Sequence, residues 1–249
     1  MIQFDRVMGS VLRLAQRAVN AHALLFDSYE ADISLIVTKV RSYTMTSPAR
    51  LAALCDAIAH VVRYQIPGDF VECGVWKGGS SMAAALRLIQ LGDIGRDLYL
   101  FDTFEGMTRP AEIDRSGRSG FSAAAMLKSA PARSKLLARA VIDEVRGNMA
   151  ATGYPTHLMH FVQGPVEETL PAQAPENIAV LRLDTDWYKS TKHELVHLFP
   201  CLSKGGILII DDYGDWEGAR QAVDEYFAEM GIPIFLHRID HTGRITVKP

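Results

Sequence analysis

The sequence predicts a doubly wound α/β fold with a mostly parallel sheet, and two observations carry that prediction. Short apolar runs of strand length recur along the chain, and helical stretches separate most of them. An apolar run without polar alternation is typical of a strand buried on both faces of a parallel sheet. The alternation of such strands with helices is the βαβ rhythm of a doubly wound fold.

The N-terminal part of the chain is predicted to be helical. Residues 5–40 place apolar side chains at helical spacing, which favours an amphipathic helix. Such a face would cap the domain or pair with a second subunit, so we expect a homodimer or larger assembly. Ser47 before Pro48 has the form of an N-cap with proline at the first helical position, and predicts a helix to about Tyr64. Residues 1–66 are thus expected to form an N-terminal helical cap.

The sheet is predicted to contain five strands from apolar runs and a closing hairpin. The five runs are Phe70–Cys73, Leu98–Phe101, His160–Gln163, Ile178–Leu183 and Ile207–Ile210. The helices predicted between them are Ser80–Leu91, Ser134–Ala151 and Thr191–Leu202. The right-handed crossover rule would place such helices on both faces of the sheet. The antiparallel hairpin is expected from the last two strand-like segments, Ile234–Ile239 and Arg244–Val247.

Residues 104–133 fit no regular element, because glycine and proline interrupt them throughout. A loop of this length inside a compact domain is uncommon and usually functional. We therefore predict a lid that contains some helix. No linker-like composition divides the chain, so we expect a single domain over residues 1–249.

The composition excludes several classes of protein. Of 249 residues, 48% are hydrophobic and 22% are charged, so a large core can form. The formal net charge of -3 provides no basic surface for nucleic acid. No apolar run reaches the ~18 to 20 residues that cross a bilayer, and charges interrupt the N-terminus where a signal peptide would be apolar. The three cysteines lie far apart, which argues against a disulfide framework. We expect a cytoplasmic protein without a nucleic-acid or membrane partner.

A glycine-rich turn follows the first predicted strand, where open α/β sheets bind ligands. It runs from Glu72 to Ser81 and lacks both the Gly-x-Gly-x-x-Gly pattern of dinucleotide folds and the phosphate-loop pattern. Glycines let the backbone approach a ligand closely. A carboxylate at Glu72 would repel pyrophosphate, but it suits a ligand with an ammonium and a sulfonium group, such as S-adenosylmethionine. The alternative is a glycine turn that only packs a helix on the sheet.

Asp102 ends the second predicted strand, where an acidic side chain can accept hydrogen bonds from both ribose hydroxyls. The alternative is an N-cap aspartate before Thr103. The pairing of Glu72 with Asp102 is more informative than either residue alone.

Three carboxylates follow the last two apolar strands. Asp184 ends one strand, and Asp211 and Asp212 end the other. Parallel strands bring their carboxyl ends to one edge, where three carboxylates would repel one another unless a cation joined them. Oxygen ligands of this kind suit Mg²⁺, which would orient a hydroxyl acceptor and lower its pKa. The alternative is that these residues cap helices or turns, and we interpret Asp186 as such a cap or surface residue.

The chain resembles the macrocin O-methyltransferase family, known from macrolide biosynthesis. The matching stretches are Tyr43–Ser47, Gly68–Ser81, Asp102–Met107, Arg182–Thr191 and Gly205–Tyr226. The runs Val71–Gly79 and Asp211–Tyr213 are the most specific of them, whereas residues 108–160 match only loosely. Thr185 stands where the family more often has glycine, which affects the expected shape of that loop.

The resemblance implies a Rossmann-like class I methyltransferase fold that uses S-adenosylmethionine and Mg²⁺. It also implies that Asp184 is the catalytic base and a metal ligand, together with Asp211 and Asp212. The expected acceptor is a hydroxyl, usually on the sugar of a glycosylated natural product such as an antibiotic. The positions expected to bind the cofactor are Met45, Thr46, Glu72, Gly74, Trp76, Lys77, Gly78, Ser80, Asp102, Thr103 and Gly164.

Two other functions stay open at this point. A nicotinamide-dependent oxidoreductase uses a similar sheet, although the glycine spacing and Glu72 argue against it. A non-catalytic relative that serves as a binding protein is the second, although the intact acidic trio argues against it.

Overall fold

The computed structural model describes residues 31–132 and 134–249. Residues 36–249 form one compact unit, and the boundary with the preceding unit falls after Leu35. The predictions of a single domain over 1–249, a helical cap and a homo-oligomer depend in part on residues 1–30, which lie outside the described residues. They stay predictions.

The described unit is built on a seven-stranded sheet of order β3-β2-β1-β4-β5-β7-β6. The first five strands in this order are parallel, β7 pairs with β5 in the antiparallel direction, and β6 pairs antiparallel with β7. The strands are β1 Asp69–Cys73, β2 Leu98–Asp102, β3 Met159–Gln163, β4 Ile178–Leu183, β5 Leu202–Ile210, β6 His237–Arg238 and β7 Arg244–Val247. The predicted doubly wound fold and its closing antiparallel hairpin are confirmed, although the first hairpin strand is shorter than expected.

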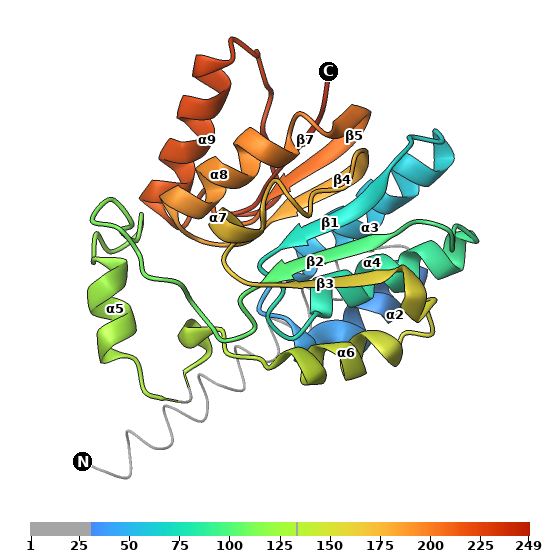
Figure 1. The fold of residues 1–249 in the computed structure, drawn as a ribbon, viewed down its shortest axis with the longest axis horizontal. Coiled ribbons are helices and arrows are strands. Elements are labelled where there is room, and N and C mark those ends of the chain that lie inside the picture. Colours follow the sequence, from blue (N-terminus) through green and yellow to red (C-terminus); the bar gives the residue numbers. More distant parts are fainter. Residues whose placement is uncertain (1–30, 133) are drawn as a thin grey trace. The chain divides into compact units, whose positions relative to one another are not determined.

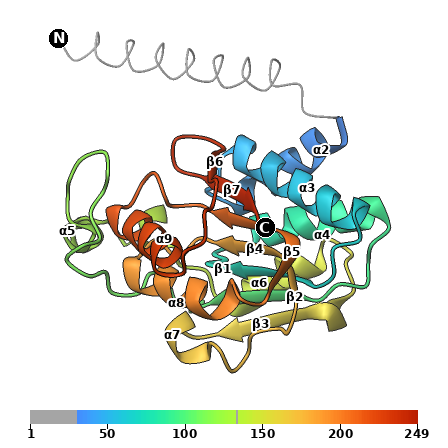
Figure 2. The ribbon, with the colours of Figure 1, turned by 90° about the horizontal axis from the view of Figure 1, so that it is seen from above.

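Helices cover both faces of this sheet (Figures 1 and 2). The group α3, α4 and α6 covers one face, and the group α7, α8 and α9 covers the other. The α-helices are α2 Ala31–Val40, α3 Pro48–Arg63, α4 Gly79–Leu91, α5 Ala123–Ser129, α6 Ile142–Ala150, α7 Val166–Thr169, α8 Tyr188–Leu198 and α9 Glu217–Glu229. The described residues also contain the 3₁₀ turns η1 Arg41–Tyr43, η2 Lys135–Leu137 and η3 Thr156–Leu158. Among the described residues, no helix is long and apolar enough to cross a membrane.

The predicted start of α3 is confirmed, and two other helix predictions are wrong at their boundaries. Ser47 caps α3 by accepting a hydrogen bond from the backbone N–H of Arg50 at 3.2 Å. The helix predicted over Ser134–Ala151 is instead η2 followed by α6, because Ala138 has a left-handed backbone with φ of 44°. The helix predicted to reach Leu202 ends at Leu198, since Pro200 cannot continue it.

Helix α9 is absent from the sequence predictions, although its buried side chains follow helical spacing. Those side chains are Ala219, Ala222, Val223, Tyr226 and Phe227. Two of them, Tyr226 and Phe227, pack edge to face against Phe199 at the end of α8. The spacing of these apolar residues is therefore a signal for a helix in this part of the sequence.

Residues 104–132 and 134–141 form an irregular excursion that follows β2 and precedes α6. The predicted lid is its first part and contains α5, and η2 lies in the remainder. Asp114 anchors the excursion from a fully buried position, where its carboxylate accepts hydrogen bonds from the backbone N–H groups of Ala111 and Tyr188 at 2.7 and 2.8 Å. A small apolar cluster of Ala123, Trp187, Trp216 and Ala219 holds the base of α5. The excursion therefore packs against the N-terminal ends of α8 and α9.

Candidate active site

A pocket of about 300 Å³ opens at the carboxyl ends of the central strands, near the point between β1 and β4 where the strand order reverses. Nine of the eleven predicted cofactor positions line it. They are Met45, Thr46, Glu72, Gly74, Trp76, Ser80, Asp102, Thr103 and Gly164. Lys77 and Gly78 do not line this pocket. The side chain of Lys77 turns to α6, where its ammonium lies 2.9 Å from the carboxylate of Glu144.

The glycine-rich loop is held by Asp102 and by close backbone packing. One carboxylate oxygen of Asp102 accepts hydrogen bonds from the backbone N–H groups of Val75 and Trp76 at 2.7 and 2.9 Å. Gly74 has a φ of 85°, and a Cβ atom there would lie 1.9 Å from the carbonyl oxygen of Asp184. Only glycine fits at this point. The loop after β1 and the loop after β4 therefore touch through backbone alone.

Glu72 is buried, with 1% of its surface exposed, and its charge is already paired. One carboxylate oxygen accepts a hydrogen bond from Nη1 of Arg182 at 2.5 Å, and the other accepts one from the hydroxyl of Ser81. Burial raises the pKa of Glu72, and Arg182 opposes that rise. The sequence predicts a free carboxylate at Glu72 that faces a cationic cofactor. In the structure both oxygens of this carboxylate already have partners within the protein.

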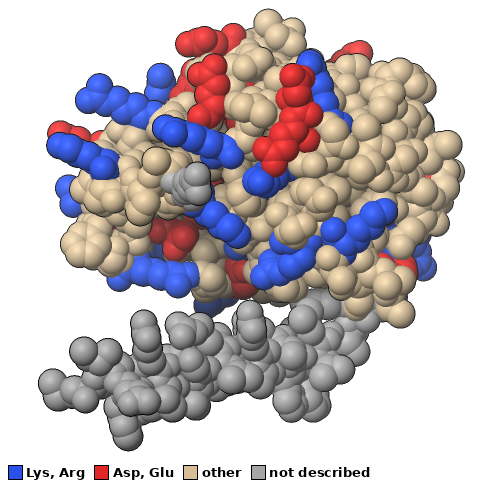
Figure 3. Space-filling model, turned by 90° about the horizontal axis from the view of Figure 1, so that it is seen from below, with Lys and Arg blue, Asp and Glu red and all other residues tan. Residues whose placement is uncertain are grey.

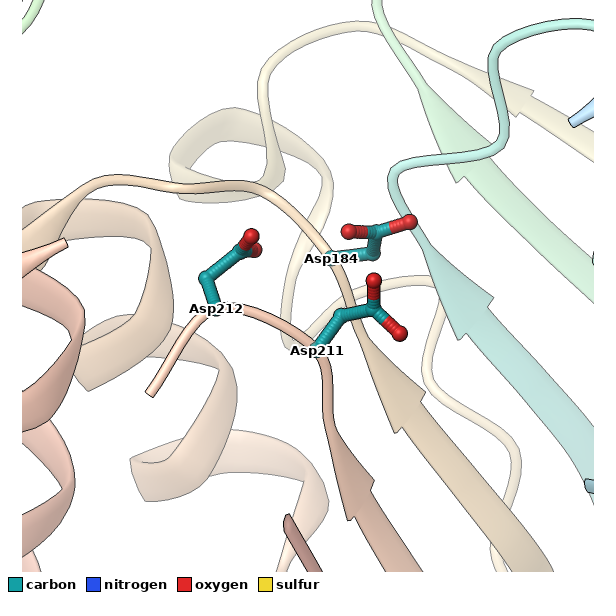
Figure 4. Close-up of side chains that lie close together, drawn as sticks. All are labelled: Asp184, Asp211 and Asp212. Carbon is teal, nitrogen blue, oxygen red and sulfur yellow. The ribbon is translucent and has the colours of Figure 1, made fainter. Parts of the chain in front are cut away.

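The three predicted metal ligands come together at the ends of β4 and β5 (Figure 4). Asp184, Asp211 and Asp212 each offer a carboxylate oxygen, and these atoms lie within 4.8 Å of one another. They form the one such cluster of potential ligands in the part of the chain that the structure describes. The rule that parallel strands gather their carboxyl ends predicted this convergence correctly.

Two arginines, which sequence analysis did not single out, balance part of this negative charge. Arg182 is 2% exposed and donates to Asp211 at 2.7 Å, and it lies 2.8 Å from Asp184. Arg50 pairs with the second oxygen of Asp211. The sequence does indicate a role for Arg182, because a charged side chain inside an apolar strand needs oppositely charged partners when it is buried. It gives no such indication for Arg50, since the position of Arg50 depends on the packing of α3.

Asp186 also belongs to this site, so its interpretation as a cap or surface residue is wrong. It lines the pocket, and its carboxylate accepts a hydrogen bond from the indole Nε1 of Trp216 at 2.6 Å. Its backbone N–H donates to Asp212 at 3.2 Å. Burial and the neighbouring Asp184 raise the pKa of Asp186 to about 8.

The cluster carries more carboxylates than cations, and this excess fits a divalent metal ion. Burial, followed by repulsion from neighbouring aspartates, raises the pKa of Asp212 well above its ordinary value. Burial raises the pKa of Asp184 in the same way, with Arg182 opposing and Asp211 and Asp212 adding to the rise. Carboxylates that repel one another are stabilised by a shared cation, and hard oxygen donors are those that Mg²⁺ prefers.

The histidine pair His193 and His197 on α8 lies outside the pocket. The ring centroids are 4.3 Å apart, and Nε2 of His193 is 3.4 Å from the carbonyl oxygen of Leu170. A packed helix position explains both residues without a ligand.

Comparisons with known proteins agree with this geometry. The family model for macrocin-O-methyltransferase (TylF) matches residues 26–247. The 8-demethyl-8-(2,3-dimethoxy-alpha-L-rhamnosyl)-tetracenomycin-C 4'-O-methyltransferase of Streptomyces olivaceus is 35% identical over 206 residues, which cover 81% of this chain and 74% of that protein. Demethyldecarbamoylnovobiocin O-methyltransferase of Streptomyces niveus is 33% identical over 204 residues, with coverage of 81% and 74%.

A solved structure supports the same assignment. The O-methyltransferase NovP superposes with a TM-score of 0.71 at 31% identity, and the match covers 83% of this chain and 82% of NovP. The family resemblance and the Rossmann-like fold class predicted from the sequence are therefore confirmed. The chain belongs to the macrocin O-methyltransferase family and is a methyltransferase.

Proposed function

We propose that this enzyme transfers a methyl group from S-adenosylmethionine to a hydroxyl of a sugar on a natural product, with Mg²⁺ at the Asp184, Asp211 and Asp212 cluster. The observation that carries the proposal is that this cluster and the glycine-rich loop line one pocket. The name of the Streptomyces olivaceus relative specifies a rhamnosyl group, and that of a 30% identical Micromonospora griseorubida relative specifies mycinamicin III. Both names support a glycosylated acceptor.

The chain's own residues provide the binding and proton-transfer groups. Asp184, Asp211 and Asp212 would hold the metal ion, which would supply Lewis-acid activation of the acceptor hydroxyl. Arg182 holds one oxygen of Asp184 at 2.8 Å and so orients its carboxyl group. Burial raises the pKa of Asp184, and the neighbouring Asp211 and Asp212 add to that rise while Arg182 opposes it. We propose that Asp184 takes the hydroxyl proton as the oxygen attacks the methyl carbon of S-adenosylmethionine. The bond between that carbon and the sulfonium sulfur breaks, the sulfur keeps the electron pair, and S-adenosylhomocysteine leaves.

The cofactor prediction has a direct test. S-adenosylhomocysteine should raise the thermal unfolding temperature of the protein, whereas NAD should leave it unchanged, because only the first lacks a pyrophosphate. Incubation with S-adenosylmethionine, Mg²⁺ and a panel of hydroxylated sugars and phenols should then yield a methylated product by mass spectrometry. Stabilisation by NAD alone would overturn the proposal.

The metal prediction concerns stability and needs no acceptor. A ligand at 100 times its Kd stabilises the folded state by ~2.7 kcal/mol. For a domain of this size that corresponds to a rise in Tm of about 5 to 10 °C. We expect Mg²⁺ to produce such a rise, EDTA to reverse it, and Asp212→Asn to lose most of it. Asp215→Asn is the matched control, because Asp215 lines the pocket outside the cluster. Equal shifts in both variants would contradict the metal assignment.

A further inference from the structure

A second hollow of about 420 Å³ adjoins the methyl-transfer pocket. Met107 and Thr108 line both of them, so the hollow extends the pocket away from the carboxylate cluster. The excursion between β2 and β3 forms its wall, much of which is apolar and includes Pro110, Leu127 and Leu137. The shared lining places the hollow next to the pocket, so that an acceptor bound in the pocket can extend into it.

Two arginines line the hollow without a charged partner. Arg109 and Arg139 make no ion pair or side-chain hydrogen bond with any described residue, and Glu105 is the one acidic residue in the lining. Figure 3 shows Lys and Arg side chains mixed with Asp and Glu over this face of the molecule, with several Lys and Arg side chains at its left edge. Guanidinium groups beside an apolar wall are suited to phosphate or carboxylate, which they bind through paired hydrogen bonds.

The backbone around both arginines is fixed relative to the active site. The carbonyl oxygen of Thr108 accepts a hydrogen bond from Nε1 of the buried Trp187 at 3.2 Å, which sets the start of Arg109. The backbone N–H of Met107 donates to the carbonyl oxygen of Leu137 at 3.2 Å, which joins the two ends of the excursion.

Gly106 completes this arrangement. It has a φ of 113°, and a Cβ atom there would lie 2.9 Å from Cγ of Arg139. The stem of Arg139 therefore lies directly against the backbone of Gly106, in a place that a larger residue would take.

We propose that this hollow binds a negatively charged group, a phosphate or a carboxylate, on the part of the acceptor beyond the methylated sugar. The proposal rests on the proposed function, since it deepens the same site. It assigns the charge of the acceptor, which the carboxylate cluster alone does not determine. Arg109 and Arg139 then select acceptors, while the residues at the strand ends perform the reaction.

The test compares probes that differ in charge and share one sugar. They are phenyl α-L-rhamnoside, which is uncharged, 4-carboxyphenyl α-L-rhamnoside, and nucleoside-diphosphate rhamnose. Their binding to the protein with S-adenosylhomocysteine and Mg²⁺ is measured by calorimetry. At least one charged probe should bind about tenfold tighter than the uncharged one, as expected for charge-assisted hydrogen bonds. The carboxylate and diphosphate arms distinguish the two sources of charge.

The variants identify the groups responsible. The double variant Arg109→Gln with Arg139→Gln should bind charged and uncharged probes alike. Lys128→Gln, which removes an exposed cation from α5 outside the hollow, should keep the preference. Equal binding by wild type, no binding of either charged probe, or a preference that survives the double variant would overturn the inference. Binding of S-adenosylhomocysteine is measured first, because its failure would overturn the proposed function instead.

Discussion

Replacing Asp184 by asparagine should abolish most turnover while the protein still binds S-adenosylhomocysteine. The change keeps the size of the side chain but removes the proton acceptor and one charge of the cluster. Loss of a positioned general base lowers the rate by roughly 10² to 10⁴-fold. Turnover is measured by product mass spectrometry, and cofactor binding by calorimetry on the same sample.

The control for Asp184→Asn is Asp224→Asn on the exposed face of α9, which should keep wild-type activity. Raising the Mg²⁺ concentration separates the two roles of Asp184, because a lost metal ligand is partly compensated by excess metal whereas a lost base is not. Full activity of Asp184→Asn would remove this residue from the mechanism.

The second large effect is expected on stability. Arg182→Met should lower the free energy of unfolding by about 3 to 5 kcal/mol, because it leaves buried carboxylates without their partner. Glu72, Asp184 and Asp211 would all lose a contact of 2.5 to 2.8 Å to the guanidinium. For a domain of this size, Tm should fall on the order of 10 °C. Thermal unfolding followed by circular dichroism measures it.

The pH dependence of this loss has a definite sign. Without Arg182, the folded-state pKa values of Glu72 and Asp184 should rise further, since Arg182 lowers both. Raised carboxyl pKa values cost stability as the pH rises above the unfolded-state values, so the loss should shrink as the pH falls toward 5. Arg118→Met is the control, because Arg118 is 60% exposed and its pair with Asp215 contributes little. An equally small effect in both variants would contradict the assigned role of Arg182.

The strands and the acidic cluster were predictable because their signals are local. A run such as Ile178–Leu183 is apolar enough to require burial on both faces, and it is a strand with those bounds. The aspartates come immediately after these strands in the sequence. Their convergence was predictable because parallel strands place their carboxyl ends at the same edge of the sheet. The helix ends were less predictable, because the left-handed turn at Ala138 follows no residue that demands it.

The ion-pair partners of the acidic side chains could not be predicted from local sequence patterns. The sequence predicts a free carboxylate at Glu72 for a cofactor, yet Glu72 is paired with Arg182 across the two adjacent strands. The contact of Arg50 with Asp211 joins residues that lie far apart in the chain, and Arg50 also pairs with Asp240 at 3.1 Å. Such contacts depend on how a helix and a hairpin pack at one edge of the sheet.

The excursion between β2 and β3 has a consequence for how this enzyme could change its acceptor. Every residue proposed for metal binding and proton transfer lies outside it, and it is attached to the rest of the chain chiefly at Asp114 and at the Trp187 and Trp216 cluster. The segment can therefore vary in sequence while the residues proposed for catalysis stay the same. Exchange of this segment between relatives, with those attachment points retained, would let new acceptors arise while the methyl-transfer chemistry is inherited intact.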